Sequence, residues 1–395
     1  MKYVKFQDKE LSKLGFGIMR LPTVEPDGCV DDLEAEKLVR YAYENGVNYF
    51  DTAYIYHGGK SEETIGKYLA KFPRETWYLA NKWPGNFITV KEGKFVVEVG
   101  PNAVAEVYDS PKAIFETQLS RCGVEYFDFY LLHNVTESTY DLYTDDGLGI
   151  VEYMLSEKKA GRIKHLGFST HGKLETIENF INKYDYMEFC QIQINYLDWS
   201  LQDGERKYNL LTERDIPVIV MEPVRGGKLA NVSPQAEKLL KAARPESTPA
   251  EWAFRFLYSL PNVYVVLSGM STMEQVVENV EIFSKEDFVT DTEKALLQQV
   301  VDEMAEFVPC TACRYCTASC PQKLDISELI NTYNEAAVEF NWLVGDVLGK
   351  LTAEEKPSAC IHCGVCMPHC PQNIDIPGVM TSFAGLIEKQ ELEKK

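Results

Sequence analysis

The stretch V-N-Y-F-D-T-A-Y-I-Y-H-G-G-K-S-E-E-T-I-G, residues 47–66, decides the fold class of this chain. Val47 to Phe50 is a short apolar run of the kind that forms a buried parallel strand. Ser61 then begins a helix with amphipathic spacing. Asp51 therefore stands at the C-terminal end of a strand, where barrels and open sheets of parallel strands carry their chemistry. The stretch predicts an α/β fold with a site at this end.

The same alternation of strand and helix continues along the chain. Strands are expected at 13–21, 47–50, 77–82, 127–133, 165–169, 189–195, 217–221 and 263–268. Helices are expected at 31–43, from 61, and at 110–122, 149–159, 174–182, 208–214 and 239–257. The count is about eight strand–helix units, which favours a closed (β/α)8 TIM barrel over an open sheet.

Composition limits the function classes. The chain has 395 residues with 45% hydrophobic content, enough for a sizeable core. Its formal net charge of −20 argues against nucleic acid or an anionic membrane as a main partner, because both repel an acidic surface. A small molecule or a protein is the expected partner. Residues 1–10 lack the apolar core of a signal peptide and no apolar run has the length of a membrane span, so we expect a cytoplasmic protein.

Two further segments organise the chain. Residues 87–99, F-I-T-V-K-E-G-K-F-V-V-E-V, predict a hairpin that turns at Glu92-Gly93. Because this hairpin follows a strand's C-terminal end, it should stand over the mouth of the barrel. It either shapes a substrate pocket or is a simple surface excursion. An acidic helix at 291–307 leads to Pro309, which we take as the boundary between a barrel at 1–308 and a small, mainly helical domain at 309–395.

Four side chains are expected at the carboxyl end of the barrel. Lys82 and His133 each close an apolar strand, as Asp51 does, and Tyr56 lies in the loop after Asp51. An acid, a phenol, an amine and an imidazole together suit protonation of a carbonyl oxygen. The ammonium of Lys82 would lower the pKa of Tyr56 by stabilising its phenolate, and Asp51 would keep Lys82 charged. His133 would position the carbonyl group or help to relay the proton.

The segments around these residues resemble the aldo-keto reductase family over residues 13–283. The matching pieces are residues 50–66, the strand end at Lys82, L-L-H-N at 131–134, K-K-A-G-R-I-K-H-L-G-F-S-T at 158–170 and S-G-M-S-T-M-E-Q-V-V-E-N at 268–279. The resemblance implies a (β/α)8 barrel that binds NADPH or NADH in extended form. It implies that Asp51, Tyr56, Lys82 and His133 are the catalytic tetrad, and that hydride passes directly to the carbonyl carbon of an aldehyde or ketone.

The resemblance also implies the cofactor contacts. The residues it places there are Gly17, Met19, Ser169, Thr170, Gln193, Met221, Gly269, Met270, Ser271, Thr272, Gln275 and Asn279. Ser169 and Gln193 would contact the nicotinamide carboxamide. The segment 269–272 would lie around the adenosine phosphate, with Gln275 and Asn279.

Three departures from the family pattern affect these expectations. Thr170 stands where asparagine is usual, and Met221 stands where an aromatic ring often stacks on the nicotinamide. Gly269 and Gln275 replace the lysine and arginine that often hold the adenosine 2′-phosphate. Losing both cations removes contacts that favour NADPH, so NADH remains an alternative. Arg225 is either a substitute for them or a surface residue.

The C-terminal region carries two copies of C-x2-C-x2-C-x3-C-P. Its eight cysteines are Cys310, Cys313, Cys316 and Cys320 in the first copy and Cys360, Cys363, Cys366 and Cys370 in the second. In the bacterial ferredoxin pattern each [4Fe-4S] cluster takes three cysteines from one copy and the fourth from the other. Cluster one would use Cys370 as its fourth ligand and cluster two Cys320. Zinc is the alternative, but it is usually held by C-x2-C pairs. The helical segment at 324–356 resembles the α-helical ferredoxin modules.

The expected function is therefore NAD(P)H-dependent carbonyl reduction by a barrel fused to a two-cluster domain, in an enzyme of anaerobic character. A nicotinamide gives two electrons as hydride while each cluster accepts one, so the clusters either exchange electrons through a flavin or a redox partner protein, or are structural. Two alternatives remain open. One is an electron-transfer protein coupling NAD(P)H to a redox partner, and the other is a cofactor-binding sensor of oxygen or redox state.

Overall fold

The computed structural model describes residues 1–24, 29–98, 105–304, 308, 310, 314–370 and 372–393. The chain divides into two compact units. The first consists of Met1–Asn231 and Ser247–Thr290, and the second of Val232–Glu246 and Asp291–Lys395.

The first unit is a closed barrel of eight parallel strands. Around the barrel the order is β11-β12-β13-β14-β15-β3-β6-β7. The strands are β3 (Leu14–Gly17), β6 (Tyr49–Asp51), β7 (Tyr78–Trp83), β11 (Phe127–Leu132), β12 (Ile163–Thr170), β13 (Cys190–Gln193), β14 (Val218–Met221) and β15 (Val263–Gly269). The predicted (β/α)8 fold is thus confirmed. The first strand is shorter than expected, because the chain turns into a 3-10 helix, η1 (Ile18–Arg20), directly after Gly17.

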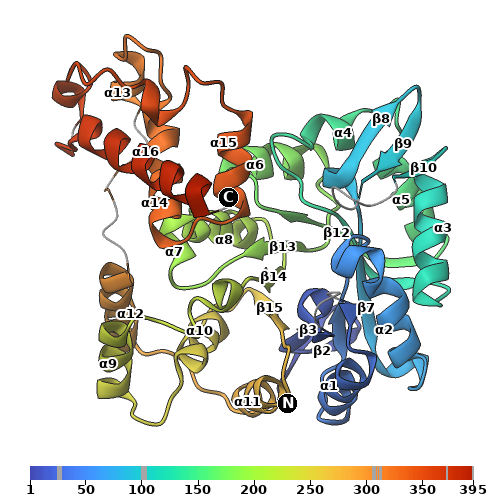
Figure 1. Ribbon diagram of the computed structural model, residues 1–395. Coiled ribbons are helices and arrows are strands. Elements are labelled where there is room, and N and C mark those ends of the chain that lie inside the picture. The colour runs from blue at the N-terminus through green and yellow to red at the C-terminus, as the bar shows by residue number, and fades with distance from the viewer. Residues whose placement is uncertain are drawn as a thin grey trace. The chain divides into compact units, whose positions relative to one another are not determined.

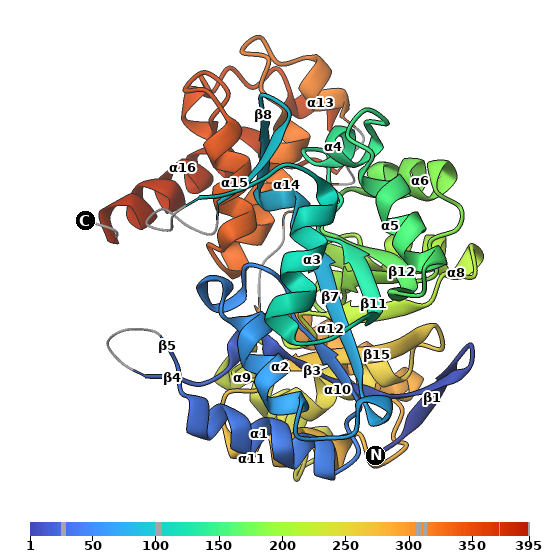
Figure 2. The ribbon, with the colours of Figure 1, turned by 90° about the vertical axis from the view of Figure 1, so that its right-hand side faces the viewer.

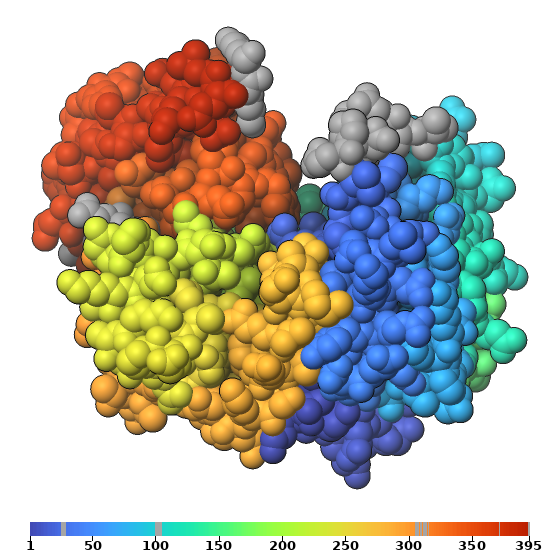
Figure 3. Space-filling model, turned by 60° about the horizontal axis from the view of Figure 1, so that its bottom comes forward, coloured from blue at the N-terminus to red at the C-terminus, as the bar shows by residue number. Residues whose placement is uncertain are grey.

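Helices cover the outside of the barrel. They are α1 (Asp32–Glu44), α2 (Ser61–Leu69), α3 (Pro111–Cys122), α4 (Tyr140–Thr144), α5 (Ile150–Lys159), α6 (Leu174–Lys183), α7 (Asp198–Leu201), α8 (Gly204–Glu213), α10 (Pro249–Tyr258) and α11 (Met273–Ile282). Figure 2 shows α2, α3 and α5 outside the strands β7, β11 and β12. On the surface in Figure 3, the gold segment containing α11 lies against the blue segment containing α1, where the last barrel strand pairs with the first.

One expected helix is wrong. The segment 239–257 forms two helices, α9 (Pro234–Ala243) and α10 (Pro249–Tyr258), and not one. Pro245 and Pro249 account for the break, because proline lacks the N–H that a continuous helix needs and restricts the residue before it. Pro249 instead occupies the first turn of α10, where the Thr248 hydroxyl accepts a hydrogen bond from the Glu251 amide.

An N-terminal hairpin, which the sequence analysis did not predict, closes one end of the barrel. Its strands β1 (Tyr3–Phe6) and β2 (Lys9–Ser12) pair in antiparallel fashion. Phe6 and Leu11 are buried among side chains from inside the barrel, and the Phe6 and Phe129 rings lie 5.3 Å apart. The hairpin therefore fills the end opposite to the carboxyl ends of the strands.

A small antiparallel sheet follows β7. It contains β8 (Ile88–Lys91), β9 (Lys94–Val97) and β10 (Glu106–Tyr108) in the order β10-β9-β8. The predicted hairpin turn is confirmed: Glu92 (φ 50°) and Gly93 (φ 75°) both have positive φ, as a two-residue hairpin turn requires. The third strand was not expected, and Val99 lies outside the described residues. Another two-stranded pair consists of β4 (Thr23–Val24) and β5 (Cys29–Val30).

The second unit is mainly helical, as predicted. Its helices are α9, α12 (Asp291–Met304), α13 (Tyr315–Ala318), α14 (Ile326–Val338), α15 (Trp342–Lys350) and α16 (Ile376–Glu393); α9 and α12 pack on each other (Figure 1). Its core contains Leu324, Ile330 and Phe383, together with Cys316 and Cys366. Within the described part of both units, no helix combines the length and apolar character of a membrane span.

Candidate active site

Lys82 and Asp51 form a buried ion pair at the carboxyl end of the barrel. They come from the adjacent parallel strands β7 and β6. The Lys82 Nζ atom lies 2.6 Å from Asp51 Oδ1 and donates to the Thr52 carbonyl at 2.7 Å. Burial lowers the pKa of Lys82, but Asp51 and Tyr56 outweigh it and hold the pKa above its ordinary value. Burial also raises the pKa of Asp51, against the effect of Lys82. Lys82 is therefore charged at neutral pH.

Tyr56 lies over this ion pair. It begins the 3-10 turn η2 (Tyr56–Gly59), and its ring centroid is 5.0 Å from Lys82 Nζ. Lys82 lowers the pKa of Tyr56, as predicted, but burial raises it by more, so the pKa lies above its ordinary value. The predicted net lowering is therefore wrong for the protein without ligands. The reason is that burial destabilises the phenolate more than the nearby ammonium stabilises it. The phenol is protonated at neutral pH.

His133 completes the group. It directly follows β11, and its ring lies 6.4 Å from that of Tyr56 at an interplanar angle of 87°. Burial lowers the pKa of His133 well below its ordinary value, and Lys82 and His171 add to this. The imidazole is thus neutral. Its Nδ1 atom is buried and has no hydrogen-bond partner among the described residues. The structure therefore brings all four expected catalytic residues together.

The segment between β7 and β8 reaches the same site. Phe87, at the end of the turn η4 (Gly85–Phe87), lies 6.0 Å from the His133 ring. The Tyr143 hydroxyl donates to the backbone carbonyl of His133 at 2.7 Å. The contact of Phe87 with His133 agrees with the expectation that the hairpin segment stands over the mouth of the barrel, whereas Tyr143 comes from α4.

A buried polar network, which the sequence pattern does not predict, holds the backbone of Lys82. The Asn81 side chain accepts from the Lys82 amide at 2.8 Å, while Gln118 Nε2 donates to the Lys82 carbonyl at 3.0 Å. Asn81 and Gln118 both donate to one oxygen of Glu62, at 2.7 and 2.8 Å. The sequence pattern predicts only a helix start around Glu62. Its spacing from Ile65 and Leu69, on the buried face of α2, was the available signal.

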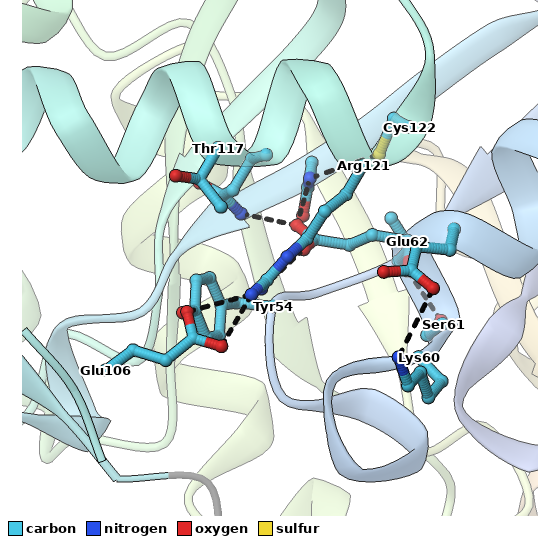
Figure 4. A network of polar contacts seen from close by, with 12 residues as sticks. Tyr54, Lys60, Ser61, Glu62, Glu106, Thr117, Arg121 and Cys122 are labelled. Atoms are coloured by element: carbon cyan, nitrogen blue, oxygen red, sulfur yellow. Dashed lines mark hydrogen bonds and ion pairs between the residues drawn. The ribbon is translucent and has the colours of Figure 1, made fainter. Parts of the chain in front are cut away.

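Arg121 connects this network to Glu106 (Figure 4). From α3 it reaches Glu62 at 3.5 Å and Glu106 at 2.6 Å. Glu106 also accepts from the hydroxyl groups of Tyr54 and Tyr108. Burial raises the pKa of Glu62, and the hydrogen bonds from Asn81, Gln118 and Arg121 oppose that rise.

The expected carboxamide contacts lie at the ends of neighbouring strands. Ser169 Oγ accepts from the Asn134 amide at 2.9 Å and can donate its own hydrogen to a bound amide. Gln193 Nε2 donates to Asp198 Oδ2 at 2.7 Å, which turns the Gln193 oxygen away from that carboxylate. These groups fit a carboxamide, since Ser169 can donate a hydrogen bond, and the oxygen of Gln193, whose side chain also hydrogen-bonds His171, can accept one.

Thr170 and Met221, which are also expected at the cofactor, already make contacts within the protein. The Thr170 hydroxyl donates to the Val135 carbonyl at 2.5 Å and accepts from the Gly172 amide at 2.8 Å, so it is used within the protein. Met221 is half-buried, and its sulfur accepts a weak contact from Gln191 Nε2 at 3.8 Å. A thioether held in this way can cover a nicotinamide face.

The residues expected around the adenosine phosphate lie where β15 meets β3. Gly269 pairs with Gly17 on the adjacent strand, and Met19 is exposed. Ser271, Thr272 and Gln275 are exposed, with Thr272 capping α11. Met270 is buried, and so is Asn279, whose amide donates to Ser268 Oγ at 2.9 Å. Those last two side chains therefore support the loop from within.

Arg225 is not a surface residue. Its side chain is only 3% exposed and forms a buried ion pair with Asp198. Asp198 also accepts from Asn195 at 2.6 Å and from Gln193. Arg225 thus supports Asp198, which in turn holds Gln193, one of the residues expected to contact the carboxamide.

In the second unit, the four cysteines predicted for cluster two line one cavity. Cys320, Cys360, Cys363 and Cys366 border an open space of about 350 Å³, which includes solvent at its mouth. Burial raises the pKa of the Cys366 thiol to about 11, and the thiols of Cys360, Cys316 and Cys320 add to this. The donor set fits a [4Fe-4S] cluster, because four thiols from two distant segments surround one space.

The structure describes three of the four cysteines predicted for cluster one. Cys310, Cys316 and Cys370 pack into or against the core of the second unit, whereas Cys313 lies outside the described residues. Across the described ranges, no three His, Cys, Asp or Glu side chains converge as ligands of a single metal ion. In a cubane cluster each thiolate binds a different iron atom, so its ligands stand apart.

A closed parallel barrel with this acid, phenol, amine and imidazole at its carboxyl end defines a barrel oxidoreductase. The chain belongs to the aldo-keto reductase family: residues 13–300 match the profile of the aldo/keto reductase family. Residues 309–374 match a 4Fe-4S dicluster domain. The family uses NAD(P)H, and the dicluster domain indicates iron–sulfur clusters.

Individual relatives agree with this assignment. A probable aldo-keto reductase 1 of Glycine max is 26% identical over 310 residues, covering 69% of this chain and 81% of the relative. An NADH-specific methylglyoxal reductase of Escherichia coli is 24% identical, covering 75% of this chain and 97% of the relative. The holo form of the aldo-keto reductase AKR11C1 from Bacillus halodurans is 26% identical with a TM-score of 0.59, covering 76% and 96%.

Proposed function

We propose that this protein reduces an aldehyde or ketone to an alcohol at the expense of NADH or NADPH. The observation that carries the proposal is the position of Lys82, which contacts Asp51 at 2.6 Å and lies 5.0 Å from the Tyr56 ring. A charged lysine next to a protonated phenol suits general acid catalysis by tyrosine.

The substrate oxygen accepts a hydrogen bond from the Tyr56 hydroxyl, and the neutral His133 ring orients the carbonyl group beside it. A bound reduced nicotinamide supplies the hydride to the carbonyl carbon. As negative charge develops on the oxygen, the Tyr56 proton moves to it. Lys82 stabilises the phenolate left behind, and Asp51 keeps Lys82 charged and in place.

Ser169, Gln193 and Met221 would hold the nicotinamide. Because Gly269 and Gln275 supply no cation, NADH is as well supported as NADPH, and the 24% identical relative from Escherichia coli is named as NADH-specific. In the second unit, two [4Fe-4S] clusters would be held by the eight cysteines of the two repeats.

A second candidate is electron transfer between NAD(P)H and a redox partner through the clusters. The exposed Cys363 at the mouth of the cavity favours it, because a cluster near solvent can exchange electrons with another protein. In that case a flavin or a partner protein would separate the two electrons of the hydride.

Tyr56→Phe tests the first candidate. The variant should lose carbonyl reduction by about 10²–10⁴-fold, the usual contribution of a general acid, and keep its iron content. The second candidate is tested by adding NADH or NADPH without a carbonyl to oxygen-free protein and recording the EPR spectrum, with dithionite as the positive control. Reduced clusters would support electron transfer. Full carbonyl reduction by Tyr56→Phe would contradict the proposed mechanism.

A further inference from the structure

The side chain of Glu106 contacts the chain segment that carries Tyr56. Glu106 lies on β10 and accepts a hydrogen bond from the hydroxyl of Tyr54. Tyr54 is buried and lies two residues before Tyr56, in the segment between β6 and α2. The same carboxylate pairs with Arg121 at 2.6 Å, and Figure 4 shows the two side chains facing each other beside Tyr54. One carboxylate therefore joins the Tyr56 segment to Arg121.

Arg121 continues the connection towards Lys82. Its guanidinium carbon lies 4.6 Å from the centre of the Tyr54 ring, and its Nη1 atom lies 3.5 Å from Glu62 Oε2. Glu62 is fully buried and accepts hydrogen bonds from the two amide side chains that hold the Lys82 backbone. A continuous series of polar contacts thus runs from Tyr54 to Lys82.

The carboxyl group of Glu106 is charged at neutral pH. Burial raises its pKa, but hydrogen bonds from Tyr108 and Tyr54 and the charge of Arg121 outweigh burial, so the pKa lies below its ordinary value. The Arg121 side chain is only 17% exposed, so water screens this pair less than an ion pair on the open surface. Charge-assisted hydrogen bonds of this kind are short and directional, which fixes the relative positions of the groups they join.

The small sheet connects Glu106 to the other side of the site. Glu106 pairs with Val97 on β9, and Val97 pairs with Ile88 on β8. Ile88 directly follows Phe87, whose ring lies 6.0 Å from that of His133. Glu106 and Ile88 therefore belong to one transverse row of the sheet. Holding Glu106 against the barrel holds that row, and with it the chain beside Phe87.

We propose that Glu106 is a positioning residue for carbonyl reduction, which sets the Tyr56 phenol against the Lys82 ammonium. This inference rests on the proposed function. The Tyr56 ring lies 5.0 Å from Lys82 Nζ, and the stabilisation of a phenolate by an ammonium falls with distance. A network that only stabilised the fold would change the free energy of unfolding and leave the rate per folded molecule unchanged.

The test is steady-state kinetics of the full-length protein loaded with its iron, without oxygen, with 4-nitrobenzaldehyde and methylglyoxal as carbonyl probes. Glu106→Gln and Tyr54→Phe should each lower kcat by about tenfold and leave the Kd of NADH and NADPH unchanged. Because the two residues share one contact, the double variant should lose no more than the larger single loss. The Glu106 side chain is 39% exposed, and Tyr54→Phe removes only a hydroxyl, so both variants should fold.

The pH dependence of kcat gives a second readout. A more distant ammonium lowers the pKa of Tyr56 less, so the alkaline midpoint of kcat should move to higher pH in Glu106→Gln and in Tyr54→Phe. A loss of folded protein would not move this midpoint.

Tyr108→Phe is the matched comparison. It removes an equivalent donor from the same carboxylate, but Tyr108 lies on β10 beside Glu106 and not in the Tyr56 segment. It should lower the free energy of unfolding about as much as Tyr54→Phe and lower kcat much less. Asp109→Asn is the control, because the exposed Asp109 pairs with Lys94 of the same sheet at 3.2 Å. Its kcat should equal that of the wild type.

Three results would overturn the inference and leave the proposed function standing. They are a wild-type kcat in either Glu106→Gln or Tyr54→Phe, additive losses in the double variant, and a kcat loss in Tyr108→Phe as large as in Tyr54→Phe. If the wild type reduces neither probe with either nucleotide, the proposed function itself is wrong, and the inference with it.

Discussion

The side-chain amide of Gln118 donates a hydrogen bond of 3.0 Å to the backbone carbonyl of Lys82. Gln118 lies on α3, a helix on the outside of the barrel. The same amide nitrogen donates to the buried carboxylate of Glu62 at 2.8 Å. The position of the lysine beside Tyr56 thus depends on residues behind the strand as well as on Asp51.

Gln118→Ala should therefore impair catalysis through Lys82. We expect kcat for carbonyl reduction to fall by about tenfold, while the Kd of the nucleotide stays unchanged, because a small displacement of the lysine weakens its interaction with the Tyr56 phenolate. Steady-state kinetics and nucleotide titration measure the two quantities. Lys112→Ala, an exposed change on the same helix, is the control. A wild-type kcat in Gln118→Ala would show that Lys82 does not need this support.

Removing either partner of the Lys82–Asp51 ion pair should lower the free energy of unfolding, but by different amounts. Asp51→Asn leaves a buried ammonium without its carboxylate and should cost about 3–5 kcal/mol in the free energy of unfolding. Lys82→Met should cost less at acid pH, because burial raises the pKa of Asp51 and favours its neutral form. Urea denaturation measures both, and the double variant should lose less than the sum.

The sign of the pH effect in Lys82→Met follows from that raised pKa. The folded state binds the Asp51 proton more tightly than the unfolded state, so the contribution of Asp51 to stability is fully present below the ordinary carboxyl pKa and is lost as pH rises from there through the raised pKa of the folded state. A difference in stability from the wild type that shrinks as pH rises through this range would contradict the assignment.

The rate of carbonyl reduction should have a broad pH plateau. The raised pKa of Tyr56 keeps the proton donor loaded through neutral pH, so the rate should fall only at alkaline pH. The pKa of His133 lies well below its ordinary value, so imidazole protonation should not affect the rate near pH 6 to 7. Measuring kcat from pH 5 to 10.5 checks both limbs. A midpoint near pH 6.5 would show that His133 titrates normally.

Iron content should depend on Cys363 and not on Cys29. Both cysteines are exposed, but only Cys363 borders the cavity assigned to cluster two. Cys363→Ala should lower iron from about eight atoms per chain to about four, and Cys29→Ala should leave it unchanged. Iron analysis and visible absorbance of oxygen-free protein measure this. A zinc site would instead yield zinc and no visible absorbance.

Several features were predictable because they are local in the sequence. Lys82 and His133 each end an apolar run, and a parallel barrel brings all such ends to one face. The hairpin turn at Glu92-Gly93 follows from a glycine, which accepts positive φ, between two short apolar runs. The two-helix form of residues 234–258 was also readable from Pro245 and Pro249, and expecting one helix there overlooked them.

Other features depend on what packs around a residue. The pKa of Tyr56 rises where a fall was predicted, because the extent of its burial outweighs the nearby charge. A surface position is one of the two expectations for Arg225, yet its side chain is buried against Asp198, which lies 27 positions earlier in the sequence. Glu62 joins side chains from β7 and α3 that a helical pattern alone does not reveal.

The sequence by itself determined the barrel, the four residues at its mouth and the two cysteine repeats, because periodicity and spacing are properties of neighbouring residues. Only the tertiary structure decided that Phe6 fills the closed end of the barrel and that Gln118 holds Lys82. Those contacts join residues 36 or more positions apart, and no local pattern encodes them because they arise when the strands close into a ring.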